Sequence, residues 1–230
     1  MDKKILILLP IWQREKITKI CFDNLKELQK DFNIEVLCIV SEQWAKVEAF
    51  KYGFKQVFAH NDCLGTKMNI GVEAALDYEF DYLMNLGSDD IITKDLFKCY
   101  EPYFADGRSM FGATRLTFID SQAKEAKKFD YGVMIGAGRC IRKDVLKDCV
   151  LRNGEVKMYD EIQSGLDMNS MGRFMRYSMT EIKNPFNSIY DIKSAVNIWG
   201  YKDFNKGEAT TFEDAVSGLT TKQIDSILDL

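Results

Sequence analysis

In the first part of the chain, short continuous apolar runs alternate with longer segments that repeat apolar residues every three or four positions. The apolar runs predict strands buried on both faces, at 4–12, 34–40, 55–59 and 80–86. The longer segments predict amphipathic helices, at 14–31, 45–52 and 65–78. Strands and helices that alternate in this order form a mostly parallel sheet flanked by helices, so we expect an α/β protein.

The pattern changes after Ile92. Residues 94–104 predict a helix that Pro102 disturbs. The runs 109–119 and 131–142 predict strands, and no clear crossover helix separates them. We therefore expect a sheet of mixed direction in the second half.

Two capping-box patterns, Thr210-x-x-Glu213 and Thr220-x-x-Gln223, predict two short helices near the end of the sequence. No internal repeat and no low-complexity linker interrupts the chain. These observations favour a single domain.

The composition is that of an ordinary soluble globular protein, with 46% hydrophobic and 29% charged residues among 230. The net charge of −4 gives no basis for non-specific nucleic-acid binding, although it leaves room for a local basic groove. The six cysteines are scattered and form no C-x-x-C pair, which favours small core residues in a reducing compartment. A single histidine, His60, argues against histidine zinc sites and a Ser-His-Asp triad.

The first apolar run follows two lysines, as the core of a signal peptide does. It is short, however, it contains Pro10, and no small-residue cleavage site follows it. We interpret it as the first strand of a cytoplasmic protein. No stretch approaches the length that spans a membrane.

Two adjacent carboxylates follow the fourth apolar run, in the stretch LGSDD. If this run is a central strand, Asp89 and Asp90 lie at its carboxyl end, where open α/β sheets place their ligands. Asp pairs are also common in turns and at helix caps, so a purely local role is the alternative.

Four segments occur in a characteristic order: LPIWQR after the first strand, GTKMNIGVEAAL in the third helix, LGSDD, and IGAGRCIRKDVL. Together they resemble nucleotide-sugar glycosyltransferases of the GT-A fold, in the broad family 2 group, over about residues 4–180. The resemblance implies one GT-A-like domain over 1–230. Its parts would be a nucleotide-binding half at about 1–95, an acceptor half at about 96–200 and a helical tail at about 201–230.

The resemblance implies a nucleotide-diphosphate-sugar donor, with a UDP-sugar favoured, and a divalent cation. A hard cation held by carboxylates and phosphates offsets the charge of the departing diphosphate. The family motif is D-x-D, and here Gly87 replaces the first acid. Asp89 is therefore the expected main ligand, with Asp90 beside it. No histidine is available as a second protein ligand, so the ligands would be carboxylate, phosphate and water oxygens, which favour Mg²⁺ or Mn²⁺.

Further positions match the family's donor site. Trp12 suits base stacking and Arg14 suits a phosphate, with core packing as the alternative for Trp12. Lys67 opens the third helix, which suits a diphosphate, and an exposed surface lysine is the alternative. The glycine-rich IGAGR segment lets backbone approach the substrate. The complete implied set is Pro10, Trp12, Arg14, Ser41, Glu42, Lys67, Asn69, Ser88, Asp90, Gly136, Gly138 and Arg139.

The reaction also needs a base that takes the proton from the acceptor hydroxyl. The family commonly uses an acid at the start of a helix after the GAGR-like segment. Asp167, Asp160 and Glu161 are the candidates, and Asp167 fits best because it follows Gly165 at a helix opening. A role in helix capping is the alternative for each.

The expected function is an inverting, metal-dependent glycosyltransferase that moves a sugar to an acceptor hydroxyl. A related nucleotidyltransferase is one alternative, but it would carry a glycine- and basic-rich loop where this chain has PIWQREK. A non-catalytic nucleotide- or carbohydrate-binding module is the other, which the missing first acid leaves open. The sequence leaves the acceptor open among a glycan, a lipid-linked sugar, a protein and a modified nucleic-acid base.

Overall fold

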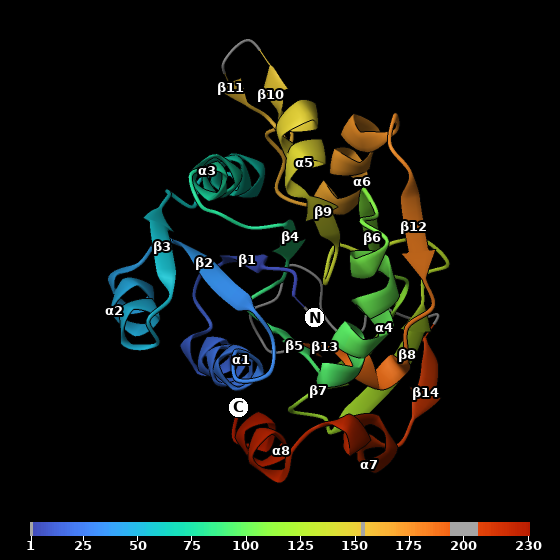
Figure 1. Ribbon diagram of the computed structural model, residues 1–230. Coiled ribbons are helices and arrows are strands. Elements are labelled where there is room, and N and C mark those ends of the chain that lie inside the picture. The colour runs from blue at the N-terminus through green and yellow to red at the C-terminus, as the bar shows by residue number, and fades with distance from the viewer. Residues whose placement is uncertain (1, 153–154, 194–206) are drawn as a thin grey trace.

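A seven-stranded sheet forms the centre of the molecule (Figure 1). This computed structural model describes residues 2–152, 155–193 and 207–230. The strands β4, β1, β2 and β3 are parallel to their neighbours in this group, which confirms the predicted parallel half. In the order β12-β6-β9-β4-β1-β2-β3, the strands are Met179–Ile182, Met110–Ala113, Cys140–Arg142, Tyr82–Asn85, Ile5–Pro10, Ile34–Val40 and Lys55–Phe58.

The sheet is covered on both faces, as its continuous apolar strands require. Alternate side chains of β1 show this directly, because Ile5 and Ile7 enter one core while Leu6 and Leu8 enter the other. Figure 1 shows α1 and α2 on one side of the sheet, and α3 and α5 on the other. These helices are Glu15–Leu28, Gln43–Lys51, Leu64–Leu76 and Lys143–Val150.

The second half of the chain is mixed in direction, as predicted. β9 is antiparallel to both of its neighbours, β4 and β6. The chain then leaves this sheet at Thr114, between β6 and β7, and contributes to a five-stranded sheet. In the order β14-β8-β7-β13-β5, its strands are Glu208–Thr210, Glu125–Asp130, Arg115–Asp120, Ile189–Lys193 and Asp90–Ile92.

Two predicted strands need correction. The run 109–119 is divided at Thr114 between the two sheets. Of the run 131–142, only the last part forms β9, because the residues before it turn repeatedly. Gly132 and Gly138 have positive φ angles of 67° and 75°, which glycine adopts without a Cβ clash.

Near the end of the chain, one predicted helix cap is confirmed and one is shifted. Thr220 and Gln223 form the predicted capping box of α8 (Thr221–Leu228). The cap of α7 (Phe212–Ala215) is Thr211, whose hydroxyl accepts a hydrogen bond from the Asp214 amide, so the cap lies one residue later than predicted and forms no capping box. Thr210 instead ends β14.

The remaining elements are short, apart from α4 (Lys94–Ala105). This helix continues through Pro102 to Ala105, although the proline cannot donate a hydrogen bond within it. The others are β10 (Leu151–Arg152), β11 (Glu155–Val156), α6 (Leu166–Met171), η1 (Gly172–Phe174), η2 (Phe186–Ser188) and η4 (Val216–Gly218).

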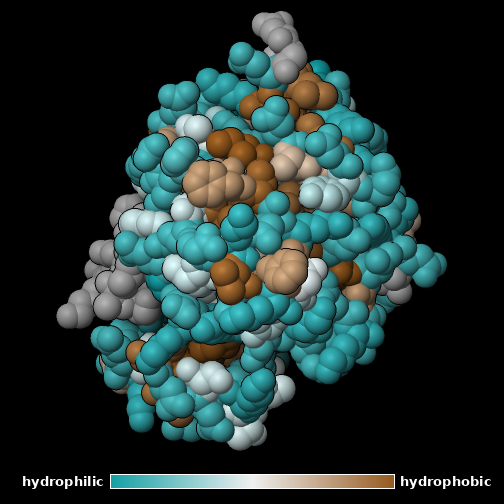
Figure 2. Space-filling model, turned by 90° about the vertical axis from the view of Figure 1, so that its left-hand side faces the viewer, coloured by the Kyte–Doolittle hydropathy of each residue, from teal (hydrophilic) through white to brown (hydrophobic). Residues whose placement is uncertain are grey.

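β3 forms one edge of the large sheet, beside α2. Figure 2 looks onto this side of the molecule, where a few apolar groups lie among hydrophilic side chains. Phe50 of α2 and Phe58 of β3 are exposed aromatic residues. Among the described helices, none is both long and apolar enough to cross a membrane.

Candidate active site

A cleft of about 620 Å³ opens at the carboxyl ends of β1 and β4. This is where open α/β sheets place their ligands. Strands β7 and β13 and the loops 131–137 and 163–168 complete its walls. Of the residues that the sequence predicts for the site, those lining the cleft are Pro10, Asp89, Asp90, Gly136 and Asp167.

The two adjacent carboxylates lie in this cleft with different partners. Asp89 accepts a hydrogen bond of 2.5 Å from Nη1 of Arg14. The other guanidinium nitrogen, Nη2, donates to the hydroxyl of Ser88 over 3.2 Å. Asp90 turns inward, and its Oδ2 accepts the backbone N–H of Gly87 at 2.7 Å. The predicted residues Arg14, Ser88 and Asp89 are thus in direct contact.

A third carboxylate, Asp191, was not predicted from the sequence. It lies opposite Asp90 in the antiparallel pair of β5 and β13, and it lines the cleft. Lys193 donates to its Oδ2 over 2.7 Å. A signal was available, because Asp191 is an acidic residue between apolar residues in the strand Ile189–Lys193.

The electrostatics of this acidic group follow from its burial. Burial and then the charges of Asp191 and Asp89 raise the pKa of Asp90 well above its usual value. Burial also raises the pKa of Asp191 to about 6, although Lys193 opposes the shift. Oδ1 of Asp191 is buried and accepts no hydrogen bond from any described residue. The group thus holds more negative charge than its described hydrogen-bond donors offset.

This donor set suits a hard divalent cation such as Mg²⁺ or Mn²⁺, which prefers carboxylate oxygens. Within the described residues, no three acidic, cysteine or histidine side chains are already arranged as a ligand cluster. Asp89, Asp90 and Asp191 would therefore supply part of a coordination sphere. Substrate phosphates and water complete such a sphere for Mg²⁺ in many enzymes.

The segment that carries Arg14 is strained. Gln13 and Arg14 have φ angles of 54° and 55°, which cost a non-glycine residue about 1 kcal/mol or more. Glu42 stabilises this backbone, since its Oε2 accepts the N–H of Gln13 at 2.6 Å and the indole N–H of Trp44 at 3.1 Å. Strain of this kind is common at functional sites.

Trp12, in the same segment, remains accessible. Its side chain is 43% exposed, so core packing, the alternative considered from the sequence, is excluded. It does not belong to the lining of the main cleft.

Lys67 and Ser41 lie inside the protein. Nζ of Lys67 donates to the carbonyl of Ile11 at 2.5 Å, to Oγ of Ser41 at 2.7 Å and to Oδ1 of Asn61 at 3.1 Å. The residue is fully buried, and burial lowers its pKa to about 8. These three bonds engage all the N–H groups of the ammonium, which leaves none for the predicted contact with a diphosphate. Lys67 instead connects the ends of β1 and β2.

Asn69 also has a role within the fold. Its Nδ2 donates to the carbonyl of Tyr159, and its Oδ1 accepts the N–H groups of Met158 and Tyr159, all within 2.9 Å. Asn85, which the sequence did not indicate, lines the cleft nearby. Its Nδ2 donates to the hydroxyl of Tyr159 at 3.0 Å, while its buried Oδ1 accepts no hydrogen bond from the described residues.

The IGAGR segment shapes the opposite wall around Asp167. The N–H of Gly136 donates to Oδ2 of Asp167 at 3.1 Å, and a Cβ on Gly136 would lie 1.9 Å from Oδ1. Glycine is therefore required for this carboxylate to occupy its position. Arg139 is fully buried, and its Nη1 donates to the carbonyl of Asp167 and to Ser170, both at 3.0 Å. Gly138 donates its N–H to the carbonyl of Asn85 at 2.8 Å.

The other two candidate bases lie outside the cleft lining. Asp160 accepts hydrogen bonds from Asn169 at 2.6 Å and from Arg173 at 2.8 Å. The bond from Asn169 and the charge of Arg173 lower the pKa of Asp160, which makes it a weaker base. Glu161 is exposed. Of the three, Asp167 alone faces the cleft.

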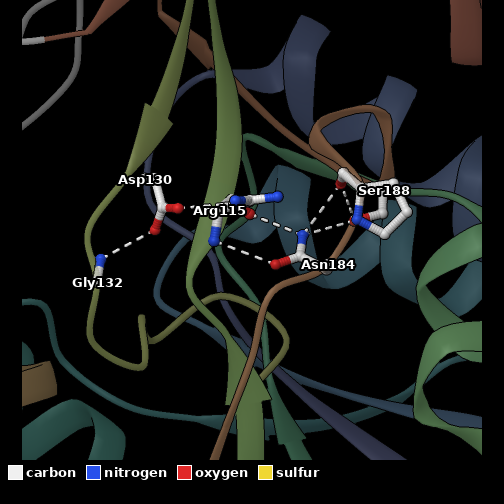
Figure 3. A network of polar contacts seen from close by, with 6 residues as sticks. Arg115, Asp130, Gly132, Asn184 and Ser188 are labelled. Atoms are coloured by element: carbon white, nitrogen blue, oxygen red, sulfur yellow. Dashed lines mark hydrogen bonds and ion pairs between the residues drawn. The ribbon is translucent and has the colours of Figure 1, made fainter.

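A polar network, with Asn184 and Ser188 buried and Asp130 at the surface, fixes the loop that follows β8 (Figure 3). Asn184 accepts the N–H of Arg115 at 3.1 Å and donates to its carbonyl at 2.8 Å and to Oγ of Ser188 at 2.6 Å. Nε of Arg115 donates to Asp130 at 2.8 Å, and Asp130 accepts the N–H of Gly132 at 3.0 Å. The network therefore sets where the chain after Asp130 enters the cleft.

This architecture, with the acidic turn at the end of β4, is the GT-A-like fold that the sequence resemblance implied. S. aureus TarS in complex with UDP is similar, with 15% identity and a TM-score of 0.59 over 98% of this chain and 69% of that chain. Glucosyl-3-phosphoglycerate synthase from Mycobacterium tuberculosis, in complex with Mn²⁺, UDP and glucosyl-3-phosphoglycerate, is also similar. Its identity is 12% and its TM-score 0.57, over 97% of this chain and 81% of that chain.

The likeness at these identities establishes the fold. The chain spans 60% of a TarS fragment covering residues 1–349 and 37% of a longer TarS structure. In sequence, the chain matches no protein-family model and no curated protein.

Proposed function

We propose that the protein is a glycosyltransferase that moves a sugar from a UDP-sugar to an acceptor hydroxyl, with a divalent cation. The observation that carries the proposal is the acidic turn Asp89–Asp90, joined by Asp191, facing Asp167 across one cleft of a GT-A-like fold. The neighbours with bound UDP, one of them with Mn²⁺, support the donor and the cation.

In the proposed donor site, Asp89, Asp90 and Asp191 hold the cation, which offsets the negative charge of the departing diphosphate. Arg14 and Lys193 are protein cations at this end, since Arg14 contacts Asp89 and Ser88 and Lys193 contacts Asp191. Trp12 is accessible for stacking on the base. Oδ1 of Asn85 is a buried acceptor at the cleft, suited to a hydroxyl of the donor sugar.

In the proposed reaction, Asp167 is the base. Its Oδ2 is held by the Gly136 N–H, so the carboxylate is oriented before the acceptor arrives. As the acceptor oxygen bonds to the anomeric carbon, its proton passes to Asp167. The bond between that carbon and the phosphate oxygen breaks, and UDP leaves. A base opposite the leaving group gives inversion of configuration.

Release of UDP from a panel of UDP-sugars, with Mn²⁺ and a mixture of simple acceptors, tests this proposal. Donor binding is measured in parallel, because a ligand that binds the folded state raises the melting temperature. We expect both a cation-dependent thermal shift and UDP release. Equal stabilisation by UDP in EDTA would contradict the metal-bridged site.

A non-catalytic binding module is the second candidate. The observation that favours it is the direct pairing of Asp89 with Arg14, which occupies the carboxylate expected to bind the cation. Such a module would show the thermal shift with UDP and Mn²⁺ but release no UDP from any donor.

A further inference from the structure

The Asp167 side of the cleft has an apolar wall. Tyr131 and Val133 from the loop after β8, and Met168 from α6, form its rim, and they are 36%, 43% and 65% exposed. Behind the rim, the lining residues are buried and apolar, namely Leu116, Phe118, Met134 and Ile135. Exposed apolar groups gathered at a cleft are typical of a ligand-binding surface.

The aromatic part of this wall is held in place before any ligand binds. The N–H of Tyr131 donates to the carbonyl of Thr114 at 2.9 Å. The ring of Tyr131 lies 4.5 Å from the ring of Phe129, between centroids. The network of Asn184, Arg115 and Asp130 fixes the strand end from which the loop starts (Figure 3). A preformed aromatic face reduces the entropy lost when a flat ligand binds.

The charges at the cleft oppose an anionic acceptor. Its described lining residues include four carboxylates, Asp89, Asp90, Asp167 and Asp191, and a single cation, Lys193. Lys193 donates to Asp191 at 2.7 Å, and its ammonium lies 5.0 Å from the ring centroid of Phe118, behind the rim. Arg139 lies behind the wall, fully buried and bonded to the carbonyl of Asp167. A phosphate near Asp167 would thus be repelled by that carboxylate, and the rim residues Tyr131, Val133 and Met168 offer no positive charge to offset the repulsion.

We propose that this wall is the acceptor subsite and that it selects an uncharged acceptor with a flat apolar group next to the reacting hydroxyl, such as an aryl glycoside. Tyr131, Val133 and Met168 are its specificity-determining residues. The apolar group lies against this rim, which directs the hydroxyl toward Asp167. The inference rests on the proposed glycosyl transfer and specifies the substrate class of that site.

The test compares two probes that differ by one phosphate, 4-nitrophenyl β-D-glucoside and its 6-phosphate. Binding of each is measured by ligand-observed NMR, with UDP and Mn²⁺ present. We expect the neutral glycoside to bind at least tenfold more tightly. No binding of the neutral glycoside, or equal or tighter binding of its 6-phosphate, would overturn the proposal.

Variants assign any binding to the wall. Tyr131→Ala and Met168→Ala should each lower the affinity for the neutral glycoside at least threefold. Phe50→Ala, which changes an exposed aromatic residue on α2, should leave this affinity unchanged. Val133→Lys should raise the affinity for the 6-phosphate at least fivefold, since it adds a cation at an exposed position. Unchanged affinities in the three rim variants would place the glycoside elsewhere and refute the subsite.

The thermal shift with UDP and Mn²⁺, recorded on the same samples, separates the two ideas. A cation-dependent shift without binding of the neutral glycoside would refute the acceptor class and leave the donor site standing. Binding of the neutral glycoside without any thermal shift from UDP and Mn²⁺ would instead contradict the proposed glycosyl transfer.

Discussion

Asp90 and Asp191 are opposite residues of the antiparallel strands β5 and β13, so two carboxylates from distant parts of the chain lie together at the cleft. Burial of like charges costs free energy, and burial raises the pKa of both carboxyl groups. Lys193 offsets part of this cost through Asp191. Such an arrangement is explained most simply by a function that uses the negative charge.

The first prediction concerns the pH dependence of stability. The pKa values of Asp90 and Asp191 are raised in the folded state, so the folded protein holds their protons more tightly than the unfolded chain does. The associated stability is present below about pH 4 and is lost as the pH rises through the raised pKa values, that of Asp191 being about 6. Asp90→Asn removes one charge. It should therefore raise the melting temperature at pH 7.5 and flatten its decline between pH 4.5 and 7.5.

The control for this experiment is Asp106→Asn, a change at an exposed carboxylate outside the cleft lining. It should reproduce the wild-type pH profile. About 1 kcal/mol corresponds to roughly 2–4 °C in a protein of this size, so the effect is measurable by calorimetry. An Asp90→Asn protein that is less stable than wild type at pH 7.5 would show that the ionised pair is not a source of strain.

The second prediction concerns cation binding by the acidic turn. Asp89→Asn removes the charge that faces Arg14 and should abolish Mn²⁺-dependent binding of UDP. Asp90→Asn should weaken it less, because Asp90 turns inward and accepts the Gly87 N–H. Isothermal titration of UDP with Mn²⁺ measures both, with Asp106→Asn as the matched control. Undiminished binding by Asp89→Asn would remove the basis for a metal site here.

The parallel half of the fold was predictable because its strands are buried on both faces. Such strands must be continuous apolar runs, and helices of clear period separate them. β8 was missed for the opposite reason, since its sequence EAKKFD is polar and mostly partly exposed. The apolar pattern of 131–142 predicts one strand. Two glycines at positive φ interrupt it, so the residues before β9 form a loop that lines the cleft.

The site was predictable where it lies at strand ends in the first half. Asp89 and Arg14 follow the ends of β4 and β1, and they lie at or beside the cleft. Asp167, in the second half, was indicated instead by the opening of helix α6. Asp191 reaches Asp90 only through the pairing of β13 with β5, which no local pattern encodes. Lys67 was misjudged because its three partners, including a backbone carbonyl, come from three separate segments.

The third prediction tests the network behind the acceptor wall. Asn184 is fully buried and bonds to both backbone groups of Arg115 and to Ser188 (Figure 3). Asn184→Ala leaves these groups without that partner and should lower the free energy of unfolding by about 2–4 kcal/mol. Urea denaturation measures the loss. The neighbouring exposed change Lys183→Ala should cost far less, and equal losses in the two variants would contradict a special role for Asn184.

The fourth prediction concerns Gly87, where a D-x-D motif would have its first acid. A positive φ angle is a common reason for a glycine in a turn. Its φ is not positive, and the structure gives a different reason. A Cβ would lie 2.8 Å from Oδ1 of Asp89 and 2.8 Å from Oδ2 of Asp90. The two carboxylates themselves occupy the space of a side chain.

Gly87→Ala and Gly87→Asp should therefore both displace the acidic turn. We expect each to lower the free energy of unfolding by about 1–3 kcal/mol, as overpacking usually does. Both should also weaken Mn²⁺-dependent UDP binding, and Gly87→Asp should not restore it by adding a ligand. Calorimetry and titration on the same samples decide the matter. Tighter cation binding by Gly87→Asp would mean that the glycine has merely lost a ligand.

The last prediction concerns the base. Asp167→Asn preserves the shape of the side chain and its acceptor for the Gly136 N–H, but it cannot take a proton. Turnover should therefore fall by about 10²–10⁴-fold, the usual contribution of a positioned base. The thermal shift with UDP and Mn²⁺ should stay unchanged, because Asp167 lies on the acceptor side. Asp160→Asn is the matched control, since that carboxylate lies outside the cleft and is bonded to Asn169 and Arg173. It should turn over normally, so a collapse in Asp160→Asn with normal turnover in Asp167→Asn would reassign the base.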